Sequence, residues 1–250
     1  MFRRGVLLAV AAALLGATGA QANTITLGNP LTTAVPGGSG FSVARTLFNT
    51  RLIDGSDPAS PVDGTVTRWA VGSPDGTFAL RVLRRVGADS YAAVAGDAER
   101  LLVFDPAPSP QQPTSLPIAK GDLISLAEGG GTSLASSNVG SSVVLPDVAE
   151  VGGPAQSPFS MSDTRSFLFN ATVRYCLVPN VFLMKEAAAR AALAAADCQV
   201  GQIIKPRKKR KRKRAKFVKA IGIAPGTAVS DTTTVDLTFG KKPKKKKKKH

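Results

Sequence analysis

The sequence predicts a mainly β protein. We expect an N-terminal antiparallel β-sandwich or jelly-roll-like domain, followed by a small α+β module with one helix on a three-stranded sheet. Short runs of alternating apolar and polar residues, typical of half-buried strands, recur between residues 24 and 174. The 24 Gly and 17 Pro of the chain favour short strands and turns over helices. Residues 184–197, with eight alanines and neither Gly nor Pro, instead predict a helix.

Seven stretches of the first domain are predicted to be strands: 41–48, 65–71, 77–84, 90–94, 100–104, 117–127 and 165–173. The turn residues of 73–76 lie between the second and third stretches and predict a β-hairpin there. Trp69 lies on an alternating strand, so we expect it in the core.

Two stretches interrupt this pattern. Residues 105–113 hold four prolines and are predicted to form a surface loop, because proline cannot donate to a β-ladder. Residues 128–163 are rich in Gly, Ser and Pro and are predicted to be a long loop, with strand character only at 142–145.

The C-terminal module is predicted to contain both strands and a helix, in the order strand, helix, strand, strand, strand. A short strand at 176–181 precedes the predicted helix, and further strands are expected at 198–204, 217–223 and 233–239. The predicted organisation is therefore a leader of residues 1–22, a sandwich of 23–174, a module of 175–240 and a disordered poly-Lys tail of 241–250.

The N-terminal segment has the pattern of a signal peptide. Two cations, Arg3 and Arg4, precede an apolar run of 6–17, and Ala20-Gln21-Ala22 has the small-x-small form that signal peptidases cleave. The run is shorter than the roughly 20 residues that span a membrane. We expect cleavage after Ala22 and a secreted or cell-wall-associated protein that begins at Asn23; a buried N-terminal helix is the alternative.

Cys176 and Cys198 are the two cysteines of the chain. In an exported protein, an isolated pair predicts one disulfide. Closing a ring of about 20 residues would stabilise the fold by roughly 3 kcal/mol. This cross-link would join the entry strand of the module to the C-terminus of its helix.

The formal net charge of +16 is unevenly distributed. Residues 23–174 carry ten basic and thirteen acidic residues, whereas 205–219 carry eleven Lys or Arg and 241–249 carry eight, without an acid in either run. Such asymmetry predicts an anionic partner for the C-terminal end. The predicted polyanion-binding residues are Lys205, Arg207, Lys208, Lys209, Arg210, Lys211, Arg212, Lys213, Arg214 and Lys216.

Several anionic partners outside the cytoplasm could bind these basic runs. Anionic glycopolymers of the cell wall and an anionic membrane surface both qualify, since each Lys or Arg near such a surface contributes about 1 kcal/mol. A nucleic-acid partner is disfavoured, because residues 205–216 and 241–249 include no aromatic residue that could stack on bases, Phe217 being the nearest.

Five short stretches of the module resemble the PASTA domain, in order and in spacing. They are Val178-Pro179-Asn180-Val181, the alanine-rich helix with Leu193, Val200-Gly201, Pro225-Gly226-Thr227 and the closing strand at 234–239. The paired cysteines resemble a disulfide-containing variant in bacterial exported proteins. The resemblance covers about a quarter of the chain and implies binding to cell-wall material such as peptidoglycan, or a spacer role. Leu183 and Glu186 depart from the family pattern.

The sequence offers no catalytic constellation. The single histidine is His250, and no Cys/His spacing typical of a metal site occurs, so we expect neither catalysis nor a cofactor. Five acids stand beside glycines and are predicted to be turn residues: Asp54, Asp63, Asp75, Asp97 and Asp122.

These features lead to two functional hypotheses. The first is an exported, non-catalytic binding protein that associates with the cell wall through its PASTA-like module and cationic segments. The alternative is a carbohydrate-binding or adhesive β-sandwich for which the module is a spacer. The turn at Lys120-Gly121-Asp122 resembles carbohydrate-binding modules in outline, but it assigns no ligand residue.

Overall fold

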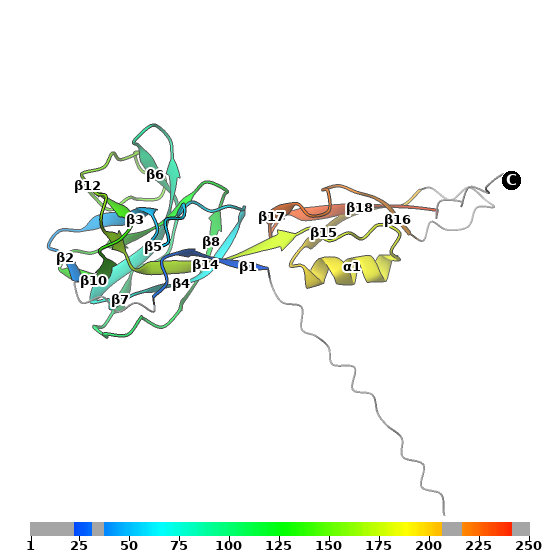
Figure 1. The fold of residues 1–250 in the computed structure, drawn as a ribbon. Coiled ribbons are helices and arrows are strands. Elements are labelled where there is room, and N and C mark those ends of the chain that lie inside the picture. Colours follow the sequence, from blue (N-terminus) through cyan, green and yellow to red (C-terminus); the bar gives the residue numbers. More distant parts are fainter. Residues whose placement is uncertain (1–22, 32–37, 207–216, 242–250) are drawn as a thin grey trace, which may run out of the picture.

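The computed structural model describes residues 23–31, 38–206 and 217–241. It is mainly β, and its strands form a β-sandwich-like lobe and a smaller lobe in which one helix packs on a sheet, as predicted (Figure 1). Within the described ranges, no helix combines the length and the hydropathy required to cross a membrane.

Three antiparallel sheets build the sandwich lobe. The first sheet has the order β1 (Thr24–Gly28), β14 (Phe169–Leu177), β4 (Gly64–Val71) and β8 (Gln112–Ile118). The second has the order β12 (Ser160–Ser162), β11 (Ser141–Leu145), β3 (Arg45–Arg51), β9 (Leu123–Glu128), β5 (Gly76–Arg85) and β6 (Tyr91–Gly96), with β7 (Arg100–Leu102) also on β5. The third, smaller sheet has the order β13 (Ser166–Phe167), β10 (Thr132–Ser137) and β2 (Gly38–Phe41).

The sandwich core is built from the large apolar side chains of these strands. Trp69, Phe78 and Phe169 are fully buried and belong to one cluster, which confirms that Trp69 is a core residue. A second cluster forms around Phe48 and Tyr91, whose ring centroids are 4.6 Å apart. Burial of these apolar side chains, aliphatic and aromatic, is the main favourable contribution to the stability of the lobe.

The predicted hairpin at 73–76 is wrong. β4 pairs with β14 and β8, whereas β5 pairs with β9, β6 and β7, so the turn carries the chain from one sheet to another. The turn is held from outside: the Gly72 N–H donates to Leu168 O at 2.7 Å, and Asp75 and Ser133 exchange two backbone bonds of 2.8 Å. A turn signal shows that the chain reverses, but not which strands pair across the reversal.

The predicted long loop at 128–163 is also wrong in part. It contains β10 and β12 in addition to the expected β11. The sequence of β10, Thr-Ser-Leu-Ala-Ser-Ser, is rich in small polar residues, yet most of the strand is buried. The predicted strand at 117–127 is divided into β8 and β9 by a turn at 119–122, where the Asp122 N–H donates to Ala119 O.

The proline-rich stretch at 105–113 leads into β8, which lies at the edge of its sheet. An edge strand tolerates Pro113 and Pro117 because its outer side needs no N–H donors.

The small lobe contains α1 (Glu186–Ala195), β15 (Gln199–Ile204), β16 (Phe217–Ile221), β17 (Ala228–Ser230) and β18 (Thr234–Gly240). The strand order is β15-β18-β16, with β15 parallel and β16 antiparallel to β18. Its core buries Leu193 of α1 against Val235, Leu237 and Phe239 of β18. Gly201 is required where β15 bulges, because a Cβ there would collide with the Asp236 carboxylate, which accepts a 2.6 Å bond from the Gln202 N–H.

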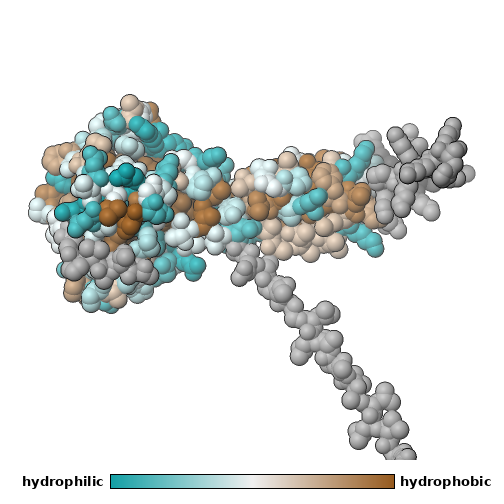
Figure 2. Space-filling view, viewed as in Figure 1, coloured by the Kyte–Doolittle hydropathy of each residue, from teal (hydrophilic) through white to brown (hydrophobic). Residues whose placement is uncertain are grey.

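Strand β14 belongs to both lobes. Its residues up to Arg174 pair with β1 and β4 of the sandwich, and Tyr175–Leu177 pair with β17. The predicted boundary between residues 174 and 175 therefore falls inside a continuous strand. Figure 2 shows the two lobes in space-filling form, joined at a narrower waist.

Candidate functional sites

The first candidate site is the end of the module that lies away from the sandwich. β15 ends at Ile204, β16 begins at Phe217 and β18 ends at Gly240. Ile204 pairs with Thr238, and Phe217 pairs with Gly240, so these three strand ends lie side by side (Figure 1). Both basic runs are continuous in sequence with these ends. The fold therefore anchors the two runs at the same pole of the molecule.

Lys205 is the first cation of the predicted polyanion-binding set, and the structure places it at this pole. Its Nζ lies 2.6 Å from a Glu186 carboxylate oxygen and 5.9 Å from the centroid of the Phe239 ring. The hydrogen bond from Lys205 lowers the pKa of Glu186 below its usual value. The Lys205 side chain is exposed and that of Glu186 is partly exposed, so this ion pair contributes little to stability. The other residues of the set, at 207–214 and 216, lie outside the described residues.

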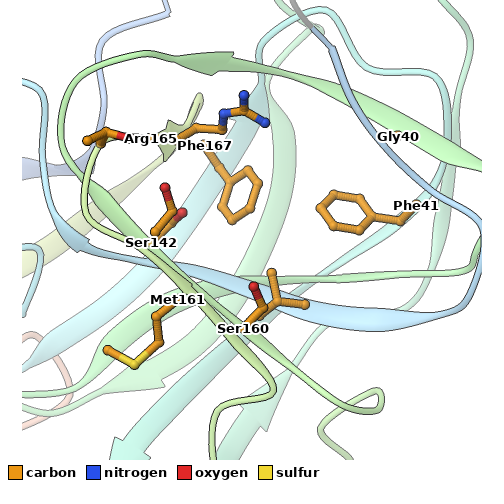
Figure 3. A pocket seen from close by; sticks show the side chains of 10 residues that line it. Gly40, Phe41, Ser142, Ser160, Met161, Arg165 and Phe167 are labelled. Atoms are coloured by element: carbon orange, nitrogen blue, oxygen red, sulfur yellow. The ribbon is translucent and has the colours of Figure 1, made fainter.

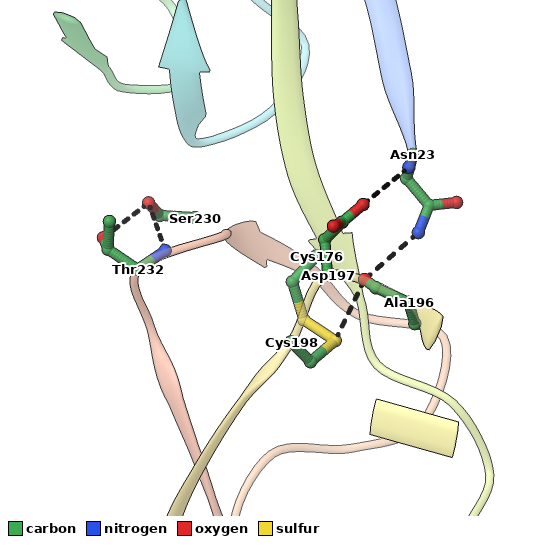
Figure 4. Close-up of a disulfide and its surroundings, with 7 residues drawn as sticks. All are labelled: Asn23, Cys176, Ala196, Asp197, Cys198, Ser230 and Thr232. Carbon is green, nitrogen blue, oxygen red and sulfur yellow. Dashed lines mark hydrogen bonds between the residues drawn. A yellow bond between two sulfur atoms is a disulfide. The ribbon is translucent and has the colours of Figure 1, made fainter. Parts of the chain in front are cut away.

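The second candidate site is the junction of the two lobes. The predicted disulfide is confirmed: Cys176 of β14 bonds Cys198, directly after the helix, with the two Cα atoms 4.9 Å apart. Both cysteines are buried in the module core. Figure 4 shows how the cross-link lies beside Asn23, Ala196 and Asp197.

Two polar contacts connect the lobes on either side of β14. The Asp231 carboxylate accepts a 2.6 Å bond from the Thr65 hydroxyl and a 2.7 Å bond from Arg174 Nε. The backbone N–H of Asn23 donates to Asp197 Oδ2 at 3.2 Å, and the Asn23 amide donates to Ala196 O at 3.2 Å. Asp231 is only 6 % exposed, and these partners offset the cost of burying its carboxylate. The cysteines of this junction could be predicted from the sequence. Asp231, Asn23 and Asp197 could not be predicted as contact residues, because they and their partners are far apart in the chain.

The third candidate site is a recess of about 390 Å³ in the sandwich, within the size range of small-ligand pockets (Figure 3). It is lined by residues of β2, β11, β12 and β13 and by the segment before β13. Its aromatic residues, Phe41 and Phe167, make an edge-on contact with ring centroids 6.0 Å apart. Arg165 is exposed at the recess, and its polar wall includes Ser142, Ser160, Ser162 and Thr164.

None of these recess residues was singled out by the sequence. The aromatic residues come from strands more than a hundred positions apart, and the serines resemble loop residues. The sequence carried one signal, the concentration of serine around Met161, and that signal alone does not distinguish a lined recess from a solvated loop.

Three of the five acids beside glycines, Asp122, Asp54 and Asp97, accept hydrogen bonds through their side chains. Asp122 is buried, forms two 2.8 Å bonds with Arg84 and accepts a bond from the Ala119 N–H in its turn. Asp54 accepts from Ser56 in a local turn. Asp97 accepts bonds from the Trp69 indole at 3.3 Å and from Arg100 at 3.0 Å.

Glu128 is the acid whose surroundings differ most from water. Burial raises its pKa, although Thr132 and the Gly130 N–H donate to one carboxylate oxygen. The other oxygen, Oε1, is buried without a hydrogen-bond partner. Within the described ranges, no three or more His, Cys, Asp or Glu side chains gather as a metal site would require.

Comparisons with known proteins returned no relative of this chain. No protein-family model matches it, and neither the curated proteins nor the solved structures include a significant match.

Proposed function

We propose that this chain is an exported, non-catalytic binding protein that attaches to anionic cell-wall material through its C-terminal module. The observation that carries the proposal is the placement of the described strand ends at 204, 217 and 240 at one pole. Eighteen cations follow or connect these ends, whereas the sandwich has more acids than bases. The fold thus separates a cationic end from a mildly acidic body.

The contacts at the pole support a role in binding rather than in folding. Among the described cations of the runs, Lys205 has an ion pair, and that pair is exposed. Charge this dense, anchored at one place, increases the local attraction for a polyanion because both runs meet the same polymer. We further propose that the folded module contacts peptidoglycan, as its resemblance to the PASTA domain implies, and that a membrane surface is a second anionic target.

The first experiment measures binding of the chain from Asn23 to purified cell walls, with and without their anionic glycopolymers, at different salt concentrations. We expect binding to the intact wall to fall at least about 10-fold between about 50 mM and 200 mM salt. Replacing the Lys and Arg residues of 207–216 by Gln, or those of 241–249, should each weaken binding and reduce the salt dependence. Replacing both sets should weaken binding most.

The matched control is Arg51→Gln, which removes an exposed sandwich cation and should leave binding unchanged. Binding that is insensitive to salt and to both sets of substitutions would contradict an electrostatic role. Turnover of a wall polysaccharide by the mature chain would contradict the non-catalytic assignment.

A second candidate function, saccharide binding by the sandwich, is favoured by the recess in Figure 3. Its hydroxyls can exchange hydrogen bonds with sugar hydroxyls, Phe41 and Phe167 offer apolar contact, and Arg165 has donors that suit a carboxylate. This combination fits an acidic saccharide better than a neutral one.

Calorimetric titration with oligogalacturonate and with a neutral oligosaccharide of equal length tests this candidate. We expect the acidic sugar to bind more tightly, and Arg165→Gln to weaken it about 10-fold or more, as expected for loss of a charge-assisted hydrogen bond. Arg51→Gln again serves as the control, and cell-wall binding through the module should not change. Equal binding of both sugars, or an unaffected Arg165→Gln variant, would refute this candidate.

A further inference from the structure

The C-terminus of α1 has an acidic residue where glycine is usual. The Cys198 N–H donates to Leu193 O at 2.9 Å and the Asp197 N–H to Ala194 O at 3.2 Å, which is the double bond pattern of a Schellman cap. Asp197 occupies the left-handed position of this cap with φ 55°. Glycine is preferred there because a Cβ is strained in that conformation.

The charge of Asp197 is unfavourable as well. The C-terminal end of a helix carries a partial negative charge and favours cations, and the last turn of α1 contains no basic residue. Asp197 is therefore disfavoured both by its backbone conformation and by its charge. Such an outlier indicates that its side chain has a role that glycine would not fill.

The group that faces this carboxylate is Asn23. Its backbone nitrogen lies 3.2 Å from Asp197 Oδ2, its side-chain amide donates to Ala196 O at 3.2 Å, and its carbonyl accepts from the Tyr175 N–H at 3.0 Å (Figure 4). Asn23 is thus held against both the helix end and β14. Arg174, the cation of β14 beside this site, is engaged by Asp231.

We infer that removal of residues 1–22 creates an α-ammonium group at Asn23 that forms an ion pair with Asp197 and caps the negative end of α1. The inference rests on the proposed export, because cleavage after Ala22 is what frees this nitrogen. Hydrolysis of the Ala22–Asn23 peptide bond consumes one water molecule. It leaves a carboxylate on Ala22 and a protonated amine on Asn23. A neutral amide donor thereby becomes a cation at the same place.

This ion pair accounts for both unfavourable features of Asp197. The ammonium group neutralises the carboxylate and supplies the positive charge that a helix C-terminus favours. It also joins β1 of the sandwich to the helix of the module, on the edge of β14 opposite the Asp231 contact. The unprocessed chain keeps the weaker amide bond, so the full connection between the lobes forms only after cleavage.

The test compares two N-termini in otherwise identical chains. One version begins at Asn23 and the other at Ala20, which moves the ammonium group three residues away; each is prepared with wild-type Asp197, with Asp197→Asn and with Asp197→Gly. We expect the melting temperature of the Asn23 version to exceed that of the Ala20 version by about 2–4 °C, the shift that one charge-assisted contact produces in a chain of this length. Asp197→Asn should abolish this difference.

Asp197→Gly provides a second test, because its effect on the melting temperature should differ between the two N-termini. In the Ala20 version it should raise the melting temperature, because strain and charge repulsion both disappear. In the Asn23 version it should not, because the ion pair is lost at the same time. Equal melting temperatures for the two N-termini, or a difference that persists in Asp197→Asn, would overturn the inference.

Sequencing the N-terminus of the exported chain tests the processing step separately. A start at Asn23 supports the inference, and any other start overturns it. Loss of wall binding in the experiments above would refute the proposed function without changing these melting temperatures, so the two failures are distinguishable.

Discussion

Replacing Trp69 by alanine should lower the free energy of unfolding by about 3–5 kcal/mol, the range found for truncation of buried aromatic residues. Trp69 is completely buried on β4, inside the main cluster of the sandwich. Truncation removes its packing, leaves a cavity and takes away the indole donor to Asp97. Chemical denaturation followed by far-UV circular dichroism measures the loss, because the substitution removes the single tryptophan and its fluorescence.

Trp69→Phe separates packing from hydrogen bonding. Phenylalanine preserves much of the volume but leaves Asp97 without one donor, so we expect a loss of only about 1–3 kcal/mol. A variant Trp69→Ala as stable as the wild type, but defective in saccharide binding, would instead assign Trp69 to a ligand platform.

Trp69→Ala should also change how the free energy of unfolding depends on pH in the acidic range. Burial raises the pKa of Asp97, but bonds from Trp69, the Ala98 N–H and Arg100 outweigh it, so that the pKa is held below its usual value. The ionised group therefore stabilises the fold above its unfolded pKa of about 3.9, and this contribution is lost as the pH falls through the lower folded value. Trp69→Ala should reduce the part of the stability that disappears on acidification.

The buried position of Trp69 and the disulfide could be predicted because each depends on a local pattern or on a simple count. Alternation placed Trp69 on a strand face, and two cysteines in a chain with a leader-like start allow one pairing. Likewise, the helix could be predicted because alanine has the highest intrinsic helix propensity and the stretch contains neither Gly nor Pro.

Strand pairing was not predictable in the same way. The turn at 73–76 has the residues of a hairpin, yet β4 and β5 enter different sheets because each covers the core from its own side. The register of each strand and the strand it pairs with are set by burial over the whole sandwich. A single sequence does not show which distant strand packs on the other side of the core. β10 shows the same effect: its small polar residues have weak strand propensity, but neighbours on both sides complete its ladder.

The junction contacts were missed for a related reason. Asn23 and Asp197 lie 174 residues apart, and Thr65 and Asp231 lie 166 apart. Asp197 could have been suspected from sequence as an acid at the end of a helix, but only the backbone conformation shows that it occupies a glycine position. The local sequence indicates where the helix ends, whereas only the fold shows that Asn23 lies against that end.

Removing the disulfide should destabilise the module by about 3 kcal/mol, because the cross-link closes a ring spanning 22 positions and restricts the unfolded chain. The double variant Cys176→Ala/Cys198→Ala avoids a free thiol, and denaturant titration in oxidising buffer measures the loss. Reductant should destabilise the wild type by a similar amount and leave the double variant unchanged. A double variant as stable as the wild type would show that the packing of the module core is sufficient without the bond.

The effect should be concentrated in the smaller lobe. The module core consists of few large side chains, and both cysteines belong to it, whereas the sandwich has its own clusters around Trp69 and Phe48. Hydrogen exchange should therefore show α1 amides losing protection before those of β4 and β5. If the cationic runs bind through their charge, as we propose, the double variant should keep a salt-dependent attachment to anionic polymers above the unfolding temperature of the module. Contacts with peptidoglycan that need the folded module should be lost at that temperature, so the variant separates the two modes of binding.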